Sequence, residues 1–182
     1  MNAYVDTGVM LARYIPGDPE NPSCSRFFER IETNKFVSVL SILELSCVFS
    51  RLLETDEVEV PPEIEESLTE LSREERIRTM VEYVLEDCGL RTVEVDPIHL
   101  TISLLGSPTK ISHVCYKALN LASELRLRTL DILHLAHISS LVDEGVQIEC
   151  LVTNDSELLA RRKQISEILR IRVLSVKETL MP

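Results

Sequence analysis

Four carboxylates in this sequence stand where apolar segments, each expected to form a strand or a helix, begin or end. They are Asp6, Glu44, Asp131 and Asp155. Two of them follow stretches typical of short strands, and the other two stand in the first turns of expected helices. Ligands of an open parallel sheet bind beyond the carboxyl ends of its strands. We therefore expect these four acids, which are far apart in sequence, to converge on one rim of a sheet.

Such a cluster of acids points to a divalent metal ion. Carboxylates within a few ångströms of one another raise one another's pKa, so four of them cannot all stay ionised without compensating positive charge. Oxygen ligands alone suit Mg²⁺ or Mn²⁺, which keep several bound waters. An ion of this kind can orient a water for in-line attack on a phosphodiester and stabilise the leaving oxygen. The acids thus predict metal-dependent phosphodiester hydrolysis.

Each acid also has a simpler interpretation as a helix-capping residue. Aspartate caps helix N-termini well, so Asp6, Asp131 and Asp155 could each play that part alone. Glu44 stands three residues after Ser41, which is the spacing of a capping box. The joint placement of four acids on one edge of a sheet is what favours the metal site.

The elements that must position these acids alternate along the chain. Short apolar or β-branched stretches predict strands at residues 2–5, 36–39, 91–96, 147–153 and 171–176. Helical patterns predict helices at residues 7–14, 23–31, 41–53, 61–89, 97–105, 110–125 and 156–169, and around Asp131 to near Gly145. Such alternation is typical of an α/β domain. We therefore expect a central, mainly parallel five-stranded sheet flanked by helices.

Length and composition favour one intracellular domain. With 182 residues, of which 45% are hydrophobic, the chain should form a single globular domain over residues 1–182. The five cysteines include no CxxC pair and are odd in number, so we expect reduced core residues rather than disulfides or a zinc site. No leader is recognised, and no apolar run approaches the ~20 residues of a membrane span. We therefore expect a cytoplasmic protein with no membrane contact.

Negative charge is abundant and unevenly placed. The net charge of −11 opposes nonspecific binding to nucleic acid, so such binding would need a local basic patch, a bound cation or a partner. Residues 54–89 are the most acidic part of the chain, yet isoleucine and leucine recur there at positions 64, 68, 71 and 77. We expect an acidic helical insertion that packs its apolar side on the domain and that could also meet a second copy of the chain.

Four motifs, in the order in which they occur, resemble the PIN domain family, and its small toxin-like ribonuclease branch in particular. They are YVDTGVMLARY (4–14), SVLSILELSCVFSRL (38–52), LRTLDILHLAH (127–137) and LVTNDSELL (151–159). The ordered set spans nearly the whole chain. Residues 54–89 depart from the family pattern, because they are longer and more acidic than the corresponding stretch of compact members.

This resemblance implies a PIN-like three-layer fold and metal-dependent cleavage of RNA. In the family, two acids at strand ends and two acids in helices line a Mg²⁺ or Mn²⁺ site. Carried onto this sequence, they fall on Asp6, Glu44, Asp131 and Asp155. The hydroxyl of Thr153 would lie near that site. Family members often act as dimers and are often restrained by an antitoxin protein, so a homodimer and an antitoxin are the expected partners.

Single-stranded RNA is the substrate that this interpretation predicts, because a flexible strand can bend into a narrow acidic rim that a rigid duplex cannot enter. The flanking phosphates need cations, and the basic run Arg161, Arg162 and Lys163 could supply them. A run of this kind is more often a solvated face. Arg126 and Arg128, close before Asp131, could play the same part.

Other motifs carry less weight. His134 and His137 form an i, i+3 pair that could bind a metal, but no third ligand with matching spacing is evident, so we expect them to pack in a helix with polar tips outward. Neither GxGxxG nor GxxxxGK occurs, so no phosphate-binding glycine loop is expected.

Two further functions stay open. A non-catalytic PIN-like protein could act as a scaffold or assemble RNA complexes, and it would keep the acids without tight metal binding. A receiver-type or haloacid-dehalogenase-type phosphotransfer domain would also place an aspartate after its first strand. Against the phosphotransfer domain, the first strand ends VDTGV, without a second aspartate two residues on.

Overall fold

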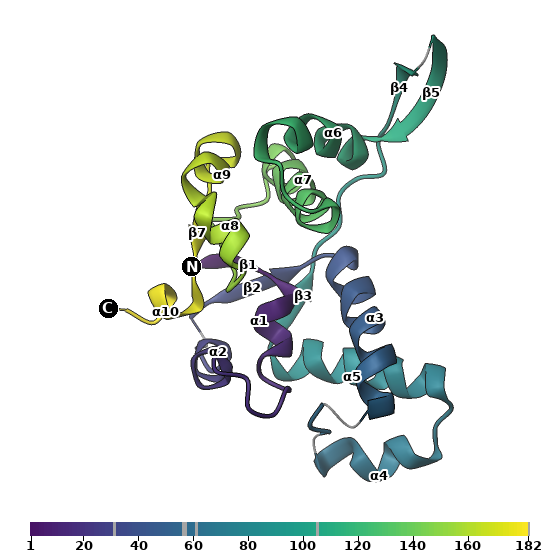
Figure 1. Cartoon of the computed structure of the whole chain (residues 1–182), viewed down its shortest axis with the longest axis vertical. Coiled ribbons are helices and arrows are strands. Elements are labelled where there is room, and N and C mark those ends of the chain that lie inside the picture. Colours follow the sequence, from purple (N-terminus) through teal and green to yellow (C-terminus); the bar gives the residue numbers. More distant parts are fainter. Residues whose placement is uncertain (31, 56–57, 61, 105, 182) are drawn as a thin grey trace.

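A five-stranded parallel sheet lies at the centre of the computed structural model, which describes residues 1–30, 32–55, 58–60, 62–104 and 106–181 (Figure 1). The strands are β1 (Asn2–Val5), β2 (Asn34–Val37), β3 (Leu90–Thr92), β6 (Cys150–Val152) and β7 (Arg172–Leu174), and their order is β3-β2-β1-β6-β7. The predicted parallel sheet is confirmed, although every strand after β1 is shifted or shorter than predicted. Predicted helices begin or end at three residues outside the described ranges, namely Ile31, Pro61 and Leu105.

Helices cover both faces of this sheet, because side chains point alternately to its two faces along each strand. Ala3 and Val5 of β1 pack into one core, and Tyr4 between them packs into another. The first core is closed by α1 (Thr7–Leu11), α2 (Asn21–Phe28), α3 (Val39–Thr55), α4 (Pro62–Glu70), α5 (Arg73–Asp87) and α10 (Val176–Thr179). The second is closed by α6 (His113–Leu125), α7 (Thr129–Asp143), α8 (Ser156–Ala160) and α9 (Arg162–Leu169). This is the predicted three-layer arrangement.

Helix α3 begins two residues earlier than the sequence predicts. The amide of Ile42 donates to the carbonyl of Ser38 (3.3 Å), which closes the first helical turn on Ser38. Ser41 therefore lies inside the helix, and its buried hydroxyl has no hydrogen-bond partner among the described residues. The predicted capping box between Ser41 and Glu44 is wrong. Glu44 consequently stands in the second turn of α3 rather than in the first.

The acidic segment folds as two helices, α4 and α5, rather than as the single helix predicted over residues 61–89. A capping box starts α5, because the Ser72 hydroxyl accepts from the amide of Glu75 (3.4 Å) and the Glu75 carboxylate accepts from the amide of Ser72 (2.9 Å). Gly89 ends α5 with a φ of +61°, as predicted. Leu68 of α4 is buried in the first core, so the apolar side of this segment packs on the chain itself.

A β-hairpin stands where the sequence predicts a helix over residues 97–105. Strands β4 (His99–Leu104) and β5 (Ser107–Ser112) pair antiparallel and project away from the central sheet (Figure 1). Alternating threonine, serine and isoleucine favour a strand here, and Gly106 turns the chain with a φ of +79°. The helix expected from Lys110 begins three residues later, as α6. The predicted helix is wrong because the apolar residues of this segment alternate with polar ones, which is the pattern of a strand.

Two features bear on the cellular location that the sequence predicts. All five cysteines are free; Cys24, Cys88 and Cys150 are buried as expected, whereas Cys47 and Cys115 are exposed on α3 and α6. None of the helices in the described ranges is both long enough and apolar enough to cross a membrane. A cytoplasmic location stays a prediction.

Candidate active site

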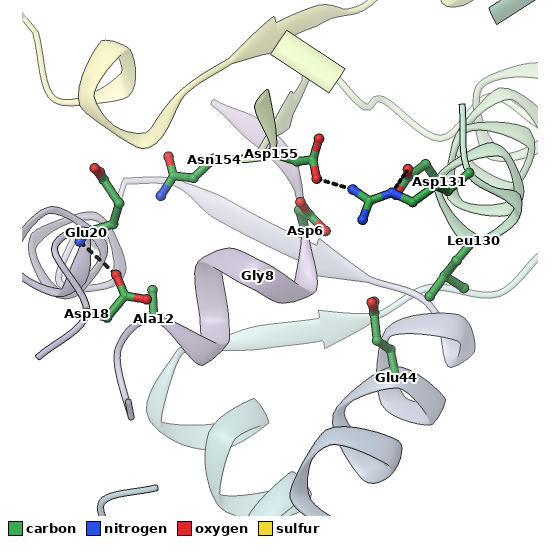
Figure 2. A pocket seen from close by; sticks show the side chains of 11 residues that line it. Asp6, Gly8, Ala12, Asp18, Glu20, Glu44, Leu130, Asp131, Asn154 and Asp155 are labelled. Carbon is green, nitrogen blue, oxygen red and sulfur yellow. Dashed lines mark hydrogen bonds and ion pairs between the residues drawn. The ribbon is translucent and has the colours of Figure 1, made fainter. Parts of the chain in front are cut away.

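A pocket of about 450 Å³ opens beyond the carboxyl ends of β1 and β6, beside α1, α3 and α7 (Figure 2). Acids dominate its lining among the described residues. They are Asp6, Asp18, Glu20, Glu44, Asp131 and Asp155, and the accompanying cation is Arg128. The structure thus brings together all four acids that the sequence singles out. Their function as metal ligands stays a prediction.

Asp6 is held in place by the register of the two central strands. Because Val5 of β1 pairs with Val152 of β6, the next residues of the two strands, Asp6 and Thr153, lie side by side. The Thr153 hydroxyl donates to Asp6 Oδ2 (2.5 Å) and accepts from the amide of Asp155 (2.9 Å). Thr153 is fully buried. It lies near the site as expected, but it is placed to hold Asp6 rather than to touch a substrate.

Asp155 combines the two interpretations that the sequence leaves open. Its Oδ1 accepts from the amides of Glu157 (2.7 Å) and Leu158 (3.1 Å), so it caps α8. Its Oδ2 faces the pocket and accepts from Arg128 Nη2 (2.5 Å) (Figure 2). Asp155 is therefore both a structural cap and a pocket carboxylate, because its two oxygens serve different partners.

Asp131 stands in the first turn of α7 and also contacts Arg128. Arg128 Nε donates to Asp131 Oδ2 (3.3 Å). Burial raises the pKa of Asp131, the guanidinium opposes this rise, and the negative charge of Asp155 adds to it, so the pKa ends above its ordinary value. Arg126, the other arginine close before Asp131, occupies the left-handed C-cap of α6 (φ 53°) and does not line the pocket.

A series of polar groups extends from the buried side of the pocket to Glu44. Ser38 Oγ lies 2.6 Å from the Tyr4 hydroxyl, which lies 3.0 Å from His134 Nδ1, and His134 Nε2 lies 3.4 Å from Glu44 Oε2. Burial raises the pKa of Tyr4 to about 12, so its hydroxyl keeps its proton. If the proton of His134 is on Nε2, its Nδ1 can accept from Tyr4, and Tyr4 can accept from Ser38. Among the described residues Nε2 has no hydrogen-bond partner of good geometry, so it contacts Glu44 by proximity and charge.

His134 is the residue beside the pocket that the sequence interpretation missed, because it predicts only helix packing for both histidines. Its partner one turn on, His137, does face away from Glu44 and lies 3.3 Å from the carbonyl of Val93. Burial raises the pKa of Glu44, but the interactions with His134 and Thr7 outweigh it and bring the pKa below its ordinary value. Glu44 consequently stays charged more readily than an ordinary glutamate.

The carboxyl of Asp6 has a raised pKa. Burial disfavours its charged form most, and the negative charges of Glu44 and Asp131 act in the same direction. The hydrogen bond from Thr153 and the charge of His134 oppose this rise without cancelling it. A positive ion in the pocket would relieve the repulsion.

Replacing Asp6 by asparagine should therefore stabilise the protein in EDTA at neutral pH, by about 1 kcal/mol, the usual gain when a strained functional group is relieved. An acid with a raised folded-state pKa binds its proton more tightly when folded. The free energy of unfolding therefore falls as the pH rises from the ordinary pKa of 3.8 through the raised pKa of the folded state. Urea unfolding of wild type and Asp6→Asn at pH 7, repeated near pH 4, measures this. The gain in stability should vanish near pH 4. A variant that is less stable than wild type at pH 7 would refute the idea that Asp6 is repelled by its neighbours.

Two further pocket acids, Asp18 and Glu20, come from the loop before α2. The sequence indicates only turn formers there. Asp18 Oδ1 accepts from the amide of Glu20 (2.8 Å), and the Glu20 carboxylate pairs with Lys177 (2.7 Å). Because both are engaged in local contacts of their own, they serve as comparison residues for the four predicted acids.

The basic run lies apart from the pocket. Arg161 and Lys163 line a separate depression on α8 and α9, and Arg162 pairs with Glu178 (2.9 Å). The structure does not bring these three residues into contact with the four acids. Their contact with flanking phosphates stays a prediction.

The donor groups of the pocket fit a hard divalent ion in their chemistry. They are carboxylate oxygens, and burial, together with the charges of neighbouring acids, raises the pKa of Asp6 and Asp131. As the side chains stand, however, no three acids, histidines or cysteines within the described ranges lie close enough together to hold a metal ion. Binding would therefore require side chains to move, and those contacting Arg128 are the first that would have to do so.

Comparison with models of protein families finds no match, and comparison with curated proteins finds none either. Among solved structures, the chain is similar to VapBC2 from Rickettsia felis bound to a DNA fragment from their promoter, with a TM-score of 0.51 and 14% identity over 96% of this chain and 98% of that chain. It is also similar to VapBC-1 from nontypeable Haemophilus influenzae, with a TM-score of 0.50 and 12% identity over 97% of this chain and 99% of that chain. At such identity the likeness shows the fold, and the PIN-like fold implied by the sequence motifs is confirmed.

Proposed function

We propose that this chain of PIN-like fold is a divalent-metal-dependent ribonuclease that hydrolyses phosphodiester bonds of single-stranded RNA. The observation that carries the proposal is the meeting of four acids at one pocket, although they come from four distant segments. They are Asp6, Glu44, Asp131 and Asp155. An acidic pocket at the carboxyl edge of a parallel sheet suits a divalent cation and the charged substrate that such a cation can bind.

Each residue has a distinct part in this proposal. Asp6, Asp131 and Asp155 would hold Mg²⁺ or Mn²⁺, and Glu44 would be the fourth carboxylate. The bound ion would activate water and stabilise the leaving oxygen. Thr153 holds the carboxylate of Asp6 in a fixed rotamer through its hydroxyl hydrogen bond.

The proposed substrate follows from the acidic lining of the pocket. An acidic rim repels the phosphates of nucleic acid unless a cation is bound, so substrate and metal should bind together. A single strand can bend to bring one phosphate into the pocket, whereas a duplex is too rigid. The basic run at residues 161–163 would hold flanking phosphates.

A protein partner is part of the proposal as well. The two similar structures are VapBC assemblies, in which VapC is a PIN-domain toxin that pairs with an antitoxin. By analogy, this chain would be the toxin of such a pair, and a small protein encoded beside it would restrain its activity. The expected homodimer stays a prediction.

Incubating the purified chain with a labelled pool of single-stranded RNA tests the activity. We expect cleavage with Mn²⁺ or Mg²⁺, none in EDTA, and a rate that rises with pH through neutrality as water bound to the ion is activated. A duplex of the same sequence is the matched substrate and should be cleaved much more slowly. Cleavage that continues in EDTA would exclude the proposed mechanism.

A non-catalytic PIN-like scaffold is the second candidate. One observation favours it: both oxygens of Asp155 are engaged, and no three potential ligands within the described part of the chain lie at metal-binding spacing. This candidate predicts that the chain binds RNA or a partner without cleaving it. Binding of RNA without cleavage across varied RNA pools, together with no tight binding of Mn²⁺ or Mg²⁺, would favour the scaffold.

A further inference from the structure

Arg128 links two of the pocket's acids. Its Nε donates to Asp131 Oδ2 (3.3 Å), and its Nη2 donates to Asp155 Oδ2 (2.5 Å). The guanidinium therefore joins the start of α7 to the cap of α8. Within the described ranges, no second cation pairs with either carboxylate.

Arg128 is the cation that contacts both carboxylates, and it is the one cation among the described residues that line the pocket. Burial and the neighbouring charge of Asp155 raise the pKa of Asp131, and Arg128 is the group that opposes them most. Without the guanidinium, neither carboxylate would be paired with a cation of the described residues, and Asp155 would keep only the amides that its Oδ1 caps.

Asp155 Oδ1 accepts from two amides of α8, so a divalent ion held by Asp131 and Asp155 would need Asp155 Oδ2, the oxygen that Arg128 contacts. The guanidinium lies on Asp131 Oδ2 and Asp155 Oδ2, and its positive charge would repel a divalent ion bound beside it. We propose that Arg128 is an internal counter-ion that competes with the divalent ion for Asp131 and Asp155, and that ion binding displaces it from the pocket. This inference rests on the proposed metal site.

The surroundings of Arg128 allow such a displacement. Its side chain is 64% exposed, so its ion pairs are screened by water and are weak enough to yield to a divalent ion. Glu157 Oε2 lies 3.7 Å from its Nε and does not line the pocket. After displacement, the guanidinium could therefore pair with Glu157 outside the pocket.

Calorimetric titration with Mn²⁺ tests the competition, using Arg128→Gln beside Arg126→Gln. The control removes the same charge two residues away, at a position that does not line the pocket. We expect Arg128→Gln to bind Mn²⁺ roughly tenfold more tightly than wild type, the effect of losing two weak competing ion pairs. Arg126→Gln should match wild type. In EDTA, the melting temperature should fall for Arg128→Gln and stay unchanged for Arg126→Gln.

A second measurement separates displacement from a general effect of charge. The ¹⁵Nε signal of Arg128, identified by its absence in Arg128→Lys, should shift during a Mg²⁺ titration with the same midpoint as ion binding. Arg126 should show no such shift. Displacement predicts this change, whereas a long-range charge effect leaves the guanidinium in place and its signal unmoved.

The outcomes distinguish this inference from the proposed function. Equal Mn²⁺ affinity in wild type and Arg128→Gln, or an Arg128 signal that ignores Mg²⁺, would overturn the competition and leave the metal site intact. Absence of Mn²⁺ binding in every variant would overturn the metal site and the competition together. Binding that appears only in Arg128→Gln would support the competition in its strongest form.

Discussion

Replacing Asp6 by asparagine should lower the rate of RNA cleavage at least ~100-fold while leaving RNA binding almost unchanged. Even residues that only orient a metal ligand cost about 10–100-fold when removed, and Asp6 is proposed as a ligand itself. The side-chain oxygen of asparagine can still accept the Thr153 hydroxyl, so the local structure should persist. Single-turnover cleavage with Mn²⁺ measures the rate, and fluorescence anisotropy of labelled RNA in EDTA measures binding.

Asp18→Asn is the matched control for this prediction. Asp18 lines the same pocket and the substitution changes the charge by the same amount, yet its Oδ1 is engaged with the amide of Glu20 in a local turn. We expect its cleavage rate to stay within about threefold of wild type, since Asp18 is not one of the proposed metal ligands and the loss of a screened charge has a small effect. Similar losses in both variants would mean that general charge, and not a ligand at Asp6, governs cleavage.

The sequence predicts the site where strand ends fix the position of a residue. Asp6 follows β1 directly, and Asp155 follows β6 by three residues, so the parallel pairing of these strands brings them to one edge. This conclusion needs only the alternation of strands and helices and the rule that ligands bind at the carboxyl edge. It does not need exact boundaries, which is why it survives a shift of α3 by two residues.

The contacts between elements could not be predicted from spacing. Arg128 meets Asp155 across 27 residues, and His134 meets Tyr4 across 130 residues. Nothing in the local pattern of either segment encodes the other. A histidine in an apolar helix is expected to pack in the core, and only the position of Tyr4 on the facing strand shows that His134 completes a polar chain to Glu44.

The wrongly predicted elements have local causes, because residues typical of helix starts and of turns stand where those elements begin or reverse. The S-x-x-E spacing at Ser72 and Glu75 marks the start of α5, and Gly106 marks the turn of the hairpin. The first strand of the hairpin, HLTISL, alternates polar and apolar residues, which is the period of a strand. Leucine content alone does not separate a strand from a helix in a segment this short.

Replacing Thr153 by valine should cost about 2–4 kcal/mol of stability, more than its small change in shape suggests. The substitution removes the donor to Asp6 Oδ2 and the acceptor for the amide of Asp155, and a polar group left unpaired in a buried position costs about 1–3 kcal/mol. In a chain of 182 residues this loss corresponds to a fall in melting temperature of roughly 5–15 °C. Differential scanning calorimetry in EDTA measures it.

The same substitution should move the pH dependence of cleavage. The Thr153 hydroxyl lowers the pKa of Asp6, so its removal raises that pKa further, and Asp6 then loses its proton only at higher pH. The acidic limb of the pH–rate profile should shift to higher pH in Thr153→Val, because the protonated carboxyl cannot bind a metal ion. Thr153→Ser keeps the hydroxyl and should retain the wild-type profile with a small loss of stability. Identical profiles for serine and valine would show that Thr153 supports the fold alone and does not position Asp6.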